Sequence, residues 1–140
     1  RVYSVHLQSY KITPIITELK KGEIWKIFAL FQLINAATCE RQSQAEKLLK
    51  HAQQSPYPTV LAGDFNSLPQ AALMDLFDDN FKNFFNIFKN GWGKTFVNGL
   101  PYFRLDYIFC NKRIQPLNYN KIEGALSDHY PILGEFLIKK

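Results

Sequence analysis

The stretch Leu61-Ala62-Gly63-Asp64-Phe65-Asn66 organises this chain. A short apolar run that starts at Thr59 leads into it and predicts a buried strand. Gly63 ends this strand where the backbone needs room, and an acid and an amide follow at once. Ligands bind at strand ends in open α/β sheets, so Asp64 and Asn66 are candidates for holding water, metal or phosphate oxygen. The alternative, of equal weight on this segment alone, is an Asx-turn in which both side chains bond only nearby backbone.

Length and composition indicate one globular domain. The chain has 140 residues, of which 46% are hydrophobic and 21% are charged, so it can bury a core and is not disordered. No apolar run approaches the ~20 residues of a membrane span. The net charge of +5 favours anionic partners only mildly, because the lysines are spread along the chain. Cys39 and Cys110 match neither a disulfide framework nor a metal-ligand spacing, and we expect structural thiols.

The start of the sequence does not look like a natural N-terminus. Residue 1 is arginine, the only methionine is Met74, and nothing resembles a signal peptide. We therefore expect residues 1–140 to be part of a longer protein, and the sequence leaves its localisation open.

Hydrophobic periodicity predicts an α/β arrangement. A helical period runs from Glu23 to about Gln54, where the polar residues 38–44 offer a place for a bend or a division. A shorter helix is expected over 71–77. The expected strands are 2–7, 59–62, 104–110, 114–122 and 132–138.

Two aromatic segments have no clear periodicity. Residues 78–90 are rich in phenylalanine, which we assign mainly to core or cover, with lining of a substrate groove as the lesser alternative. Residues 90–95 form a glycine-rich loop with one lysine. This loop could approach a phosphate but lacks the spacing of a phosphate-binding loop, so Trp92 is expected to cap the core.

An acid within an apolar strand indicates a site. Unpaired burial of Asp106 would cost several kcal/mol, so it needs a partner, a proton or a functional position. Asp128 and His129 are adjacent in sequence and point different ways in an extended chain, which leaves Asp106 as the better partner for His129. A carboxylate bonded to one ring nitrogen fixes the tautomer and raises the basicity of the other nitrogen.

The polar candidates are expected to converge on one rim of the sheet. They are Asp64, Asn66, Asp128, His129 and His6, the last of which a structural role would also explain. Carboxylate and amide oxygens without a thiolate suit a hard divalent cation such as Mg²⁺. A site of this kind can hydrolyse phosphoesters.

Four motifs in order resemble the endonuclease/exonuclease/phosphatase superfamily, which has the DNase I-like fold. They are Tyr3-Ser4-Val5-His6-Leu7, Leu61-Ala62-Gly63-Asp64-Phe65-Asn66, Arg104-Leu105-Asp106-Tyr107-Ile108 and Ser127-Asp128-His129-Tyr130-Pro131. The resemblance spans residues 2–138. It implies an α/β fold with a mostly antiparallel sheet covered by helices, forming the C-terminal half of a four-layer α/β/β/α sandwich.

The resemblance also implies roles for single residues. Asp64 would align or deprotonate the attacking water, and Asn66 would position that water and the phosphate. His6 would contact the phosphate or help the leaving group.

The other motifs imply further roles. His129 would bind the phosphate or act as base, and Asp106 would orient it. Asp128 would lie on the metal side, where Mg²⁺ or Mn²⁺ is the expected cofactor. Arg104 would bind substrate or serve a structural role at the strand end.

Half of the family's pattern is missing from this sequence. The family's metal-binding Glu belongs to the N-terminal half, so we expect the full-length protein to be a metal-dependent phosphodiesterase or nuclease and this chain alone to be inactive. Its expected partners are a phosphate-containing substrate, including nucleic acid, and a second copy of the chain on the face left by the absent half.

Two other interpretations remain open. A binding module that keeps the fold without catalysis would explain the truncation but not the retained polar residues. The third interpretation is an unrelated α/β domain in which the motifs occur by chance.

Overall fold

The computed structural model describes residues 1–10, 27–89, 91–97, 101, 103–124 and 127–139. The elements follow one another as β1 (Val2–His6), α2 (Ile27–Gln53), β2 (Val60–Asp64), α3 (Ala72–Asn80), β3 (Lys82–Asn83), α4 (Phe84–Phe88), β4 (Asp106–Cys110), β5 (Ile114–Lys121) and β6 (Ile132–Ile138). None of the helices in these ranges is long and apolar enough to cross a membrane.

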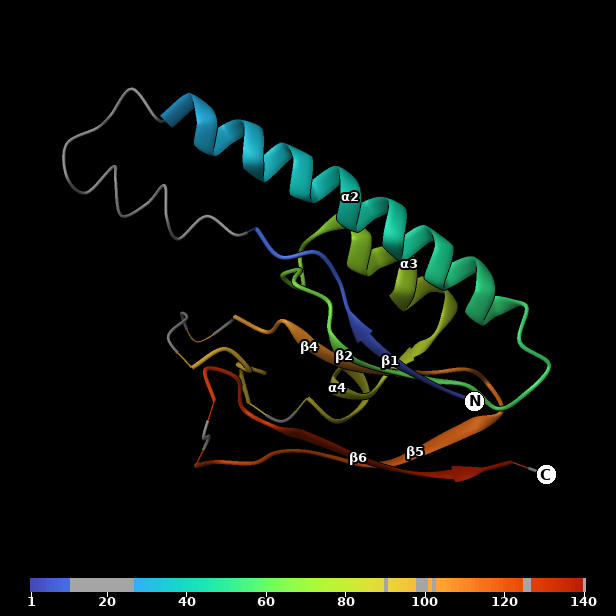
Figure 1. Ribbon diagram of the computed structural model, residues 1–140. Coiled ribbons are helices and arrows are strands. Elements are labelled where there is room, and N and C mark those ends of the chain that lie inside the picture. Colours follow the sequence, from blue (N-terminus) through green and yellow to red (C-terminus); the bar gives the residue numbers. More distant parts are fainter. Residues whose placement is uncertain (11–26, 90, 98–100, 102, 125–126, 140) are drawn as a thin grey trace.

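Two sheets and a helical layer make up the structure (Figure 1). The first sheet has the order β1-β2-β4-β3, in which β1 and β2 are parallel and the other pairs are antiparallel. The second sheet is the antiparallel pair β5-β6. Helices α2 and α3 cover one face of the first sheet, and β5-β6 lies on its other side (Figure 1). The expected α/β fold with mostly antiparallel pairing is confirmed.

Each side of the first sheet has its own apolar core. The helical side buries Phe65, Phe77 and Phe109, which are fully inaccessible and meet edge-on or tilted with ring centroids 5.1–5.5 Å apart. The side facing β5-β6 buries a second cluster that includes Phe84 and Ile114. A central strand covered on both faces explains why 59–62 is apolar without alternation.

Three details differ from the sequence-based expectation. Helix α2 runs unbroken across residues 38–44, because Ala37, Arg41 and Ala45 keep the same buried face along it; its expected start at Glu23 lies outside the described residues. The phenylalanine-rich stretch forms the short elements β3 and α4. Trp92 does not cap the core, since 77% of it is exposed.

Candidate active site

Three of the predicted residues lie in one row across the first sheet. His6 and Asp64 are the last residues of β1 and β2, and Asp106 is the first residue of β4. The strand register pairs His6 with Asp64 and Asp64 with Asp106. Directly paired residues of neighbouring strands point to the same face, so the register itself brings these side chains together.

Gly63 permits the close approach of β1 to β2 beside this row. Its φ is +142°, and a Cβ at this position would lie 2.0 Å from the carbonyl oxygen of Val5. The amide of Leu7 donates to the carbonyl of Asp64 at 3.0 Å, which closes the end of the strand pair. A side chain at residue 63 would force the two strands apart next to the site.

Asp64 and Asn66 form a rigid turn immediately after β2. The backbone amide of Asn66 donates to Asp64 Oδ1 at 2.7 Å, and Asn66 Nδ2 donates to Asp64 Oδ2 at 3.0 Å. Asn66 Nδ2 also donates to the carbonyl of Leu7 at 2.9 Å, and its φ of 50° is a conformation that asparagine tolerates. The Asx-turn is therefore present, and it also fixes the orientation of both side chains.

Asp106 and His129 make the contact that the sequence analysis expects. His129 Nδ1 lies 2.7 Å from Asp106 Oδ2, and the two side chains are 26% and 15% exposed. The hydroxyl of Thr95 accepts the amide of Asp106 at 3.1 Å and fixes the start of β4. The ring of Phe96 meets His129 edge-on at 5.3 Å and limits the movement of the imidazole.

His129 comes from outside the first sheet. It forms an isolated antiparallel bridge with Phe96 and lies in the segment that leads into β6. The rim is therefore built between the two sheets, whereas the sequence analysis expected strand ends of one sheet. Alternation within a strand cannot predict such a bridge, because it depends on how two loops pack.

The electrostatic environment raises the pKa of both His129 and Asp64. Burial lowers the pKa of His129, but the hydrogen bond and charge of Asp106, with the charges of Asp64 and Asp128, outweigh it and raise the pKa. Burial raises the pKa of Asp64, and the hydrogen bond from Asn66 opposes this only in part. A carboxylate with a raised pKa is a stronger base, which suits a group that activates water.

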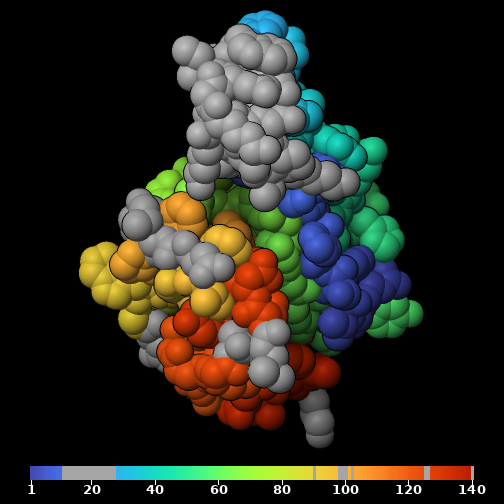
Figure 2. Space-filling view, turned by 60° about the vertical axis from the view of Figure 1, so that its left-hand side comes forward, coloured from blue at the N-terminus to red at the C-terminus, as the bar shows by residue number. Residues whose placement is uncertain are grey.

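The row opens on a cavity of about 860 Å³. His6, Asp64, Asn66, Asp106, Asp128 and His129 all line it, together with Tyr10, Leu68, Phe96 and Leu105. This volume is within the range of small-molecule sites. Figure 2 shows the surrounding surface: the green segment that follows β2 lies deep between the blue N-terminal strand and the orange-red chain near β6.

Arg104 is placed away from this cavity. It is 5% exposed, and its guanidinium carbon lies 3.8 Å from the ring centroid of Phe85 and 5.1 Å from that of Tyr107. Of the two roles expected for Arg104, this position supports the structural one, and the expected contact with substrate has no support in the geometry. Asp128 remains at the surface, where its Oδ1 accepts a hydrogen bond from Ser127 Oγ at 3.1 Å.

Sequence reasoning missed Arg41, a buried residue that joins two loops of the cavity. Arg41 Nε donates to the carbonyl of Gln8 at 2.8 Å, and Nη1 lies 3.1 Å from Tyr10 Oη and 3.5 Å from Ser67 Oγ. The guanidinium also stacks over the ring of Tyr10 at 4.2 Å. An arginine on the apolar stripe of α2, between Ala37 and Ala45, is the sequence signal that could have revealed it.

Tyr10 connects this arginine to the cavity. Burial raises the pKa of its phenol, but the hydrogen bond and charge of Arg41 outweigh burial and lower the pKa overall. A tyrosine hydroxyl with a lowered pKa is a good hydrogen-bond donor to an anionic ligand.

The described residues do not by themselves fit a metal ion. No three His, Cys, Asp or Glu side chains among them are placed to hold one. The oxygens of Asp64 and one oxygen of Asp106 are already engaged by Asn66 and His129. Any cation at this rim would need ligands beyond those that the described part of the chain provides.

Comparison with known proteins assigns the chain and its fold to one class. The model of the Endonuclease/Exonuclease/phosphatase family matches residues 22–129, and the chain belongs to that family. Members of the family are hydrolases of the nuclease and phosphatase types. No curated protein sequence gives a significant match.

Solved structures support the same fold. An endonuclease/exonuclease/phosphatase from Bacteroides vulgatus is 19% identical with a TM-score of 0.60, covering 71% of this chain and 44% of that one. The human Nocturnin catalytic domain with a bound sulfate is 20% identical with a TM-score of 0.58, covering 71% and 41%. The mannosyl-6-phosphatase of Bacteroides thetaiotaomicron is 22% identical with a TM-score of 0.52, covering 71% and 46%. This chain therefore spans less than half the length of each.

Proposed function

We propose that these residues form part of the catalytic site of a phosphoester hydrolase, most simply a phosphodiesterase. The observation that carries the proposal is the bond between Asp106 and His129 at the edge of a cavity that Asp64 and Asn66 also line. A carboxylate-oriented imidazole facing a second, fixed carboxylate can bind a phosphate and activate water at one place.

Each side chain has a role in this proposal. Asp64 aligns the attacking water and takes its proton, because burial makes it more basic and Asn66 holds its orientation. His129 donates to Asp106 through Nδ1 and, as imidazolium, donates through Nε2 to a phosphate oxygen. His6, beside Asp64 in the register, contacts the phosphate on its other side.

The cofactor in this proposal is Mg²⁺ or Mn²⁺, with Asp128 as one ligand and the remaining ligands outside the described residues. The cation would neutralise phosphate charge. Because no three His, Cys, Asp or Glu side chains of the described residues are placed to hold a metal ion, we expect the 140-residue chain to bind Mg²⁺ weakly and turn over little substrate. Hydrolysis by this chain that EDTA abolishes would contradict that expectation.

The test uses the protein with any residues that naturally flank positions 1 and 140. Phosphodiesters and phosphomonoesters are supplied with Mg²⁺ or Mn²⁺, and Asp64→Ala and His129→Ala are compared with the exposed Asp79→Asn. Each site variant should lower kcat by about 10²–10⁴-fold, whereas the control keeps its activity. If the parent protein binds a phosphate ligand but hydrolyses none of these esters, the result would instead support the non-catalytic binding module.

A further inference from the structure

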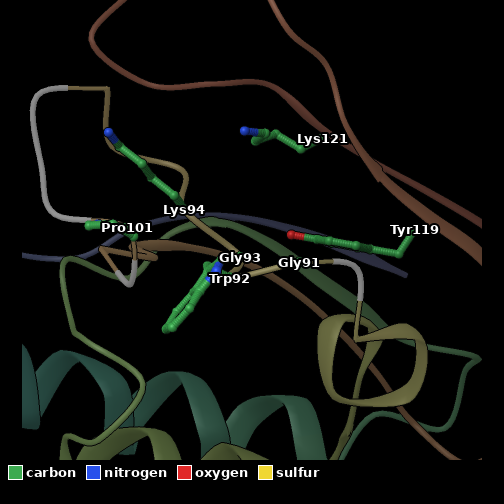
Figure 3. A pocket seen from close by; sticks show the side chains of 7 residues that line it. All are labelled: Gly91, Trp92, Gly93, Lys94, Pro101, Tyr119 and Lys121. Atoms are coloured by element: carbon green, nitrogen blue, oxygen red, sulfur yellow. The ribbon is translucent and has the colours of Figure 1, made fainter.

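A second cavity, of about 340 Å³, lies between β5 and the loop that contains Trp92. Its lining includes Trp92 and Lys94 from that loop, with Tyr119 and Lys121 from β5. Figure 3 shows the two lysines on one side of this pocket and the indole of Trp92 on the other. Among the described residues the lining contains two ammonium groups and no carboxylate, so its charge favours an anion.

Backbone geometry holds Trp92 in solvent. Gly91 and Gly93 have φ values of +70° and +74°, and they turn the chain on both sides of the indole. A Cβ on Gly93 would lie 2.5 Å from the ring of Phe85, so this glycine packs where no side chain fits. A large aromatic side chain that is 77% exposed on a fixed turn is a suitable surface for stacking a flat ring.

Lys121 remains available to a ligand. Lys121 Nζ is 2.8 Å from Glu123 Oε1, but Glu123 is exposed, and exposed pairs of this kind are weak and screened by salt. Lys121 also lies 4.4 Å from the ring centroid of Tyr130, which places its ammonium group over a fixed aromatic face. A bound phosphate could therefore replace Glu123 as the partner of Lys121.

The pocket adjoins the catalytic cavity. Lys94 is two residues from Phe96, and Tyr130 directly follows His129. The amide of Tyr130 donates to the carbonyl of Thr95 at 2.7 Å, which joins the two segments. The segment 94–96 thus contributes Lys94 to this pocket and Phe96 to the other cavity.

We propose that this pocket is a second binding site for a ligand that carries both a phosphate group and an aromatic ring, as a nucleotide does. The phosphate binds Lys94 and Lys121, and the ring stacks on Trp92. That a single substrate occupies this pocket and the catalytic cavity together rests on the proposed function, whereas binding at the pocket does not.

Trp92 supplies the signal for a binding test on the 140-residue chain. Trp25 is the only other tryptophan, so a Trp25→Phe background isolates the fluorescence of Trp92. The ligands are a nucleoside monophosphate, its nucleoside, inorganic phosphate, a sugar phosphate and a short oligonucleotide. The monophosphate should quench Trp92 and bind about tenfold more tightly than the nucleoside, the phosphate or the sugar phosphate.

Variants locate the binding. Lys94→Ala and Lys121→Ala should each weaken binding of the monophosphate by about tenfold. Lys112→Ala, which removes an exposed charge from the turn after β4, should leave this binding unchanged. Asp64→Ala should leave the quenching unchanged, because that residue lines the other cavity.

The outcomes separate the possibilities. Quenching lost in Asp64→Ala, or equal affinity for the sugar phosphate, would overturn the second site. An oligonucleotide that binds more tightly than the monophosphate assigns the site to a polymer, and equal binding assigns it to a free nucleotide. Persistent quenching in a protein that hydrolyses no phosphoester would refute the proposed function and leave the pocket assignment intact.

Discussion

Replacing Gly63 by alanine should separate β1 from β2 at the rim of the cavity that Asp64 lines. The new Cβ would meet the carbonyl oxygen of Val5 at 2.0 Å, and that atom belongs to the backbone and cannot rotate away. The φ of +142° adds strain of about 1–3 kcal/mol for a residue with a side chain. Separation of the strands would also weaken about two hydrogen bonds, including the one from Leu7 to Asp64, at about 1 kcal/mol each.

Together these effects predict a loss of about 3–5 kcal/mol in the free energy of unfolding, a large part of a domain's usual ~5–15 kcal/mol. Urea denaturation followed by circular dichroism should show the midpoint lowered by about 2 M. Hydrogen exchange gives a local measurement, in which the amide of Leu7 should lose its protection first.

Gly91→Ala is the matched control. Its φ is +70°, but a Cβ there meets no atom within 4 Å, so only the backbone strain of about 1 kcal/mol applies. Equal shifts of the urea midpoint for the two variants would refute the reasoning, because they would show that contact with β1 adds nothing.

Three further predictions concern the site and the surface. Asp106→Asn should lower the pKa of His129, measured by NMR titration, because the hydrogen bond and charge of Asp106 raise it. In the unaltered protein the raised pKa of His129 means that folding favours the imidazolium form. This contribution to stability is present below the unfolded pKa of 6.5 and is lost as pH rises through the folded pKa. Arg41→Ala should lower the free energy of unfolding by about 2–4 kcal/mol, because it removes buried charged hydrogen bonds. The exposed apolar side chains of β5 and β6 should cause the chain to self-associate at high concentration, as light scattering would detect.

Each of these has a control or a contrary result. The exposed Asp75→Asn should leave the His129 titration unchanged, and an unchanged titration in Asp106→Asn would contradict the assigned bond. Lys47→Ala, an exposed change on α2, should alter stability by less than about 0.5 kcal/mol. A monomer at every concentration would argue against the association.

Hydrophobic patterning predicted the bounds of two strands well, one of them buried and the other largely exposed. The stretch 132–138 coincides with β6, and 59–62 differs from β2 only at its ends. The patterning failed at Trp92, because its exposure depends on how Gly93 packs against Phe85. Such a contact joins residues through the fold and leaves no local signal.

The candidate site was likewise predictable from the sequence only in part. Chemistry and motif order pointed to the pairing of Asp106 with His129, since a half-buried acid needs a partner. The supports of that pair were not foreseen: Thr95 caps the start of β4 through its hydroxyl, and Arg41 reaches two loops from a helix. Both depend on distances between segments that a sequence pattern does not contain.

The transverse alignment of His6, Asp64 and Asp106 has a consequence for how this chain can vary. Insertions in the connecting loops leave the alignment intact, because hydrogen-bond ladders rather than loop lengths set it. Deleting a single residue within β2 would turn Asp64 to the opposite face of the sheet and separate it from His6 and Asp106, while the fold could still form. Tolerance to length change should therefore be high between the strands and nearly absent inside them.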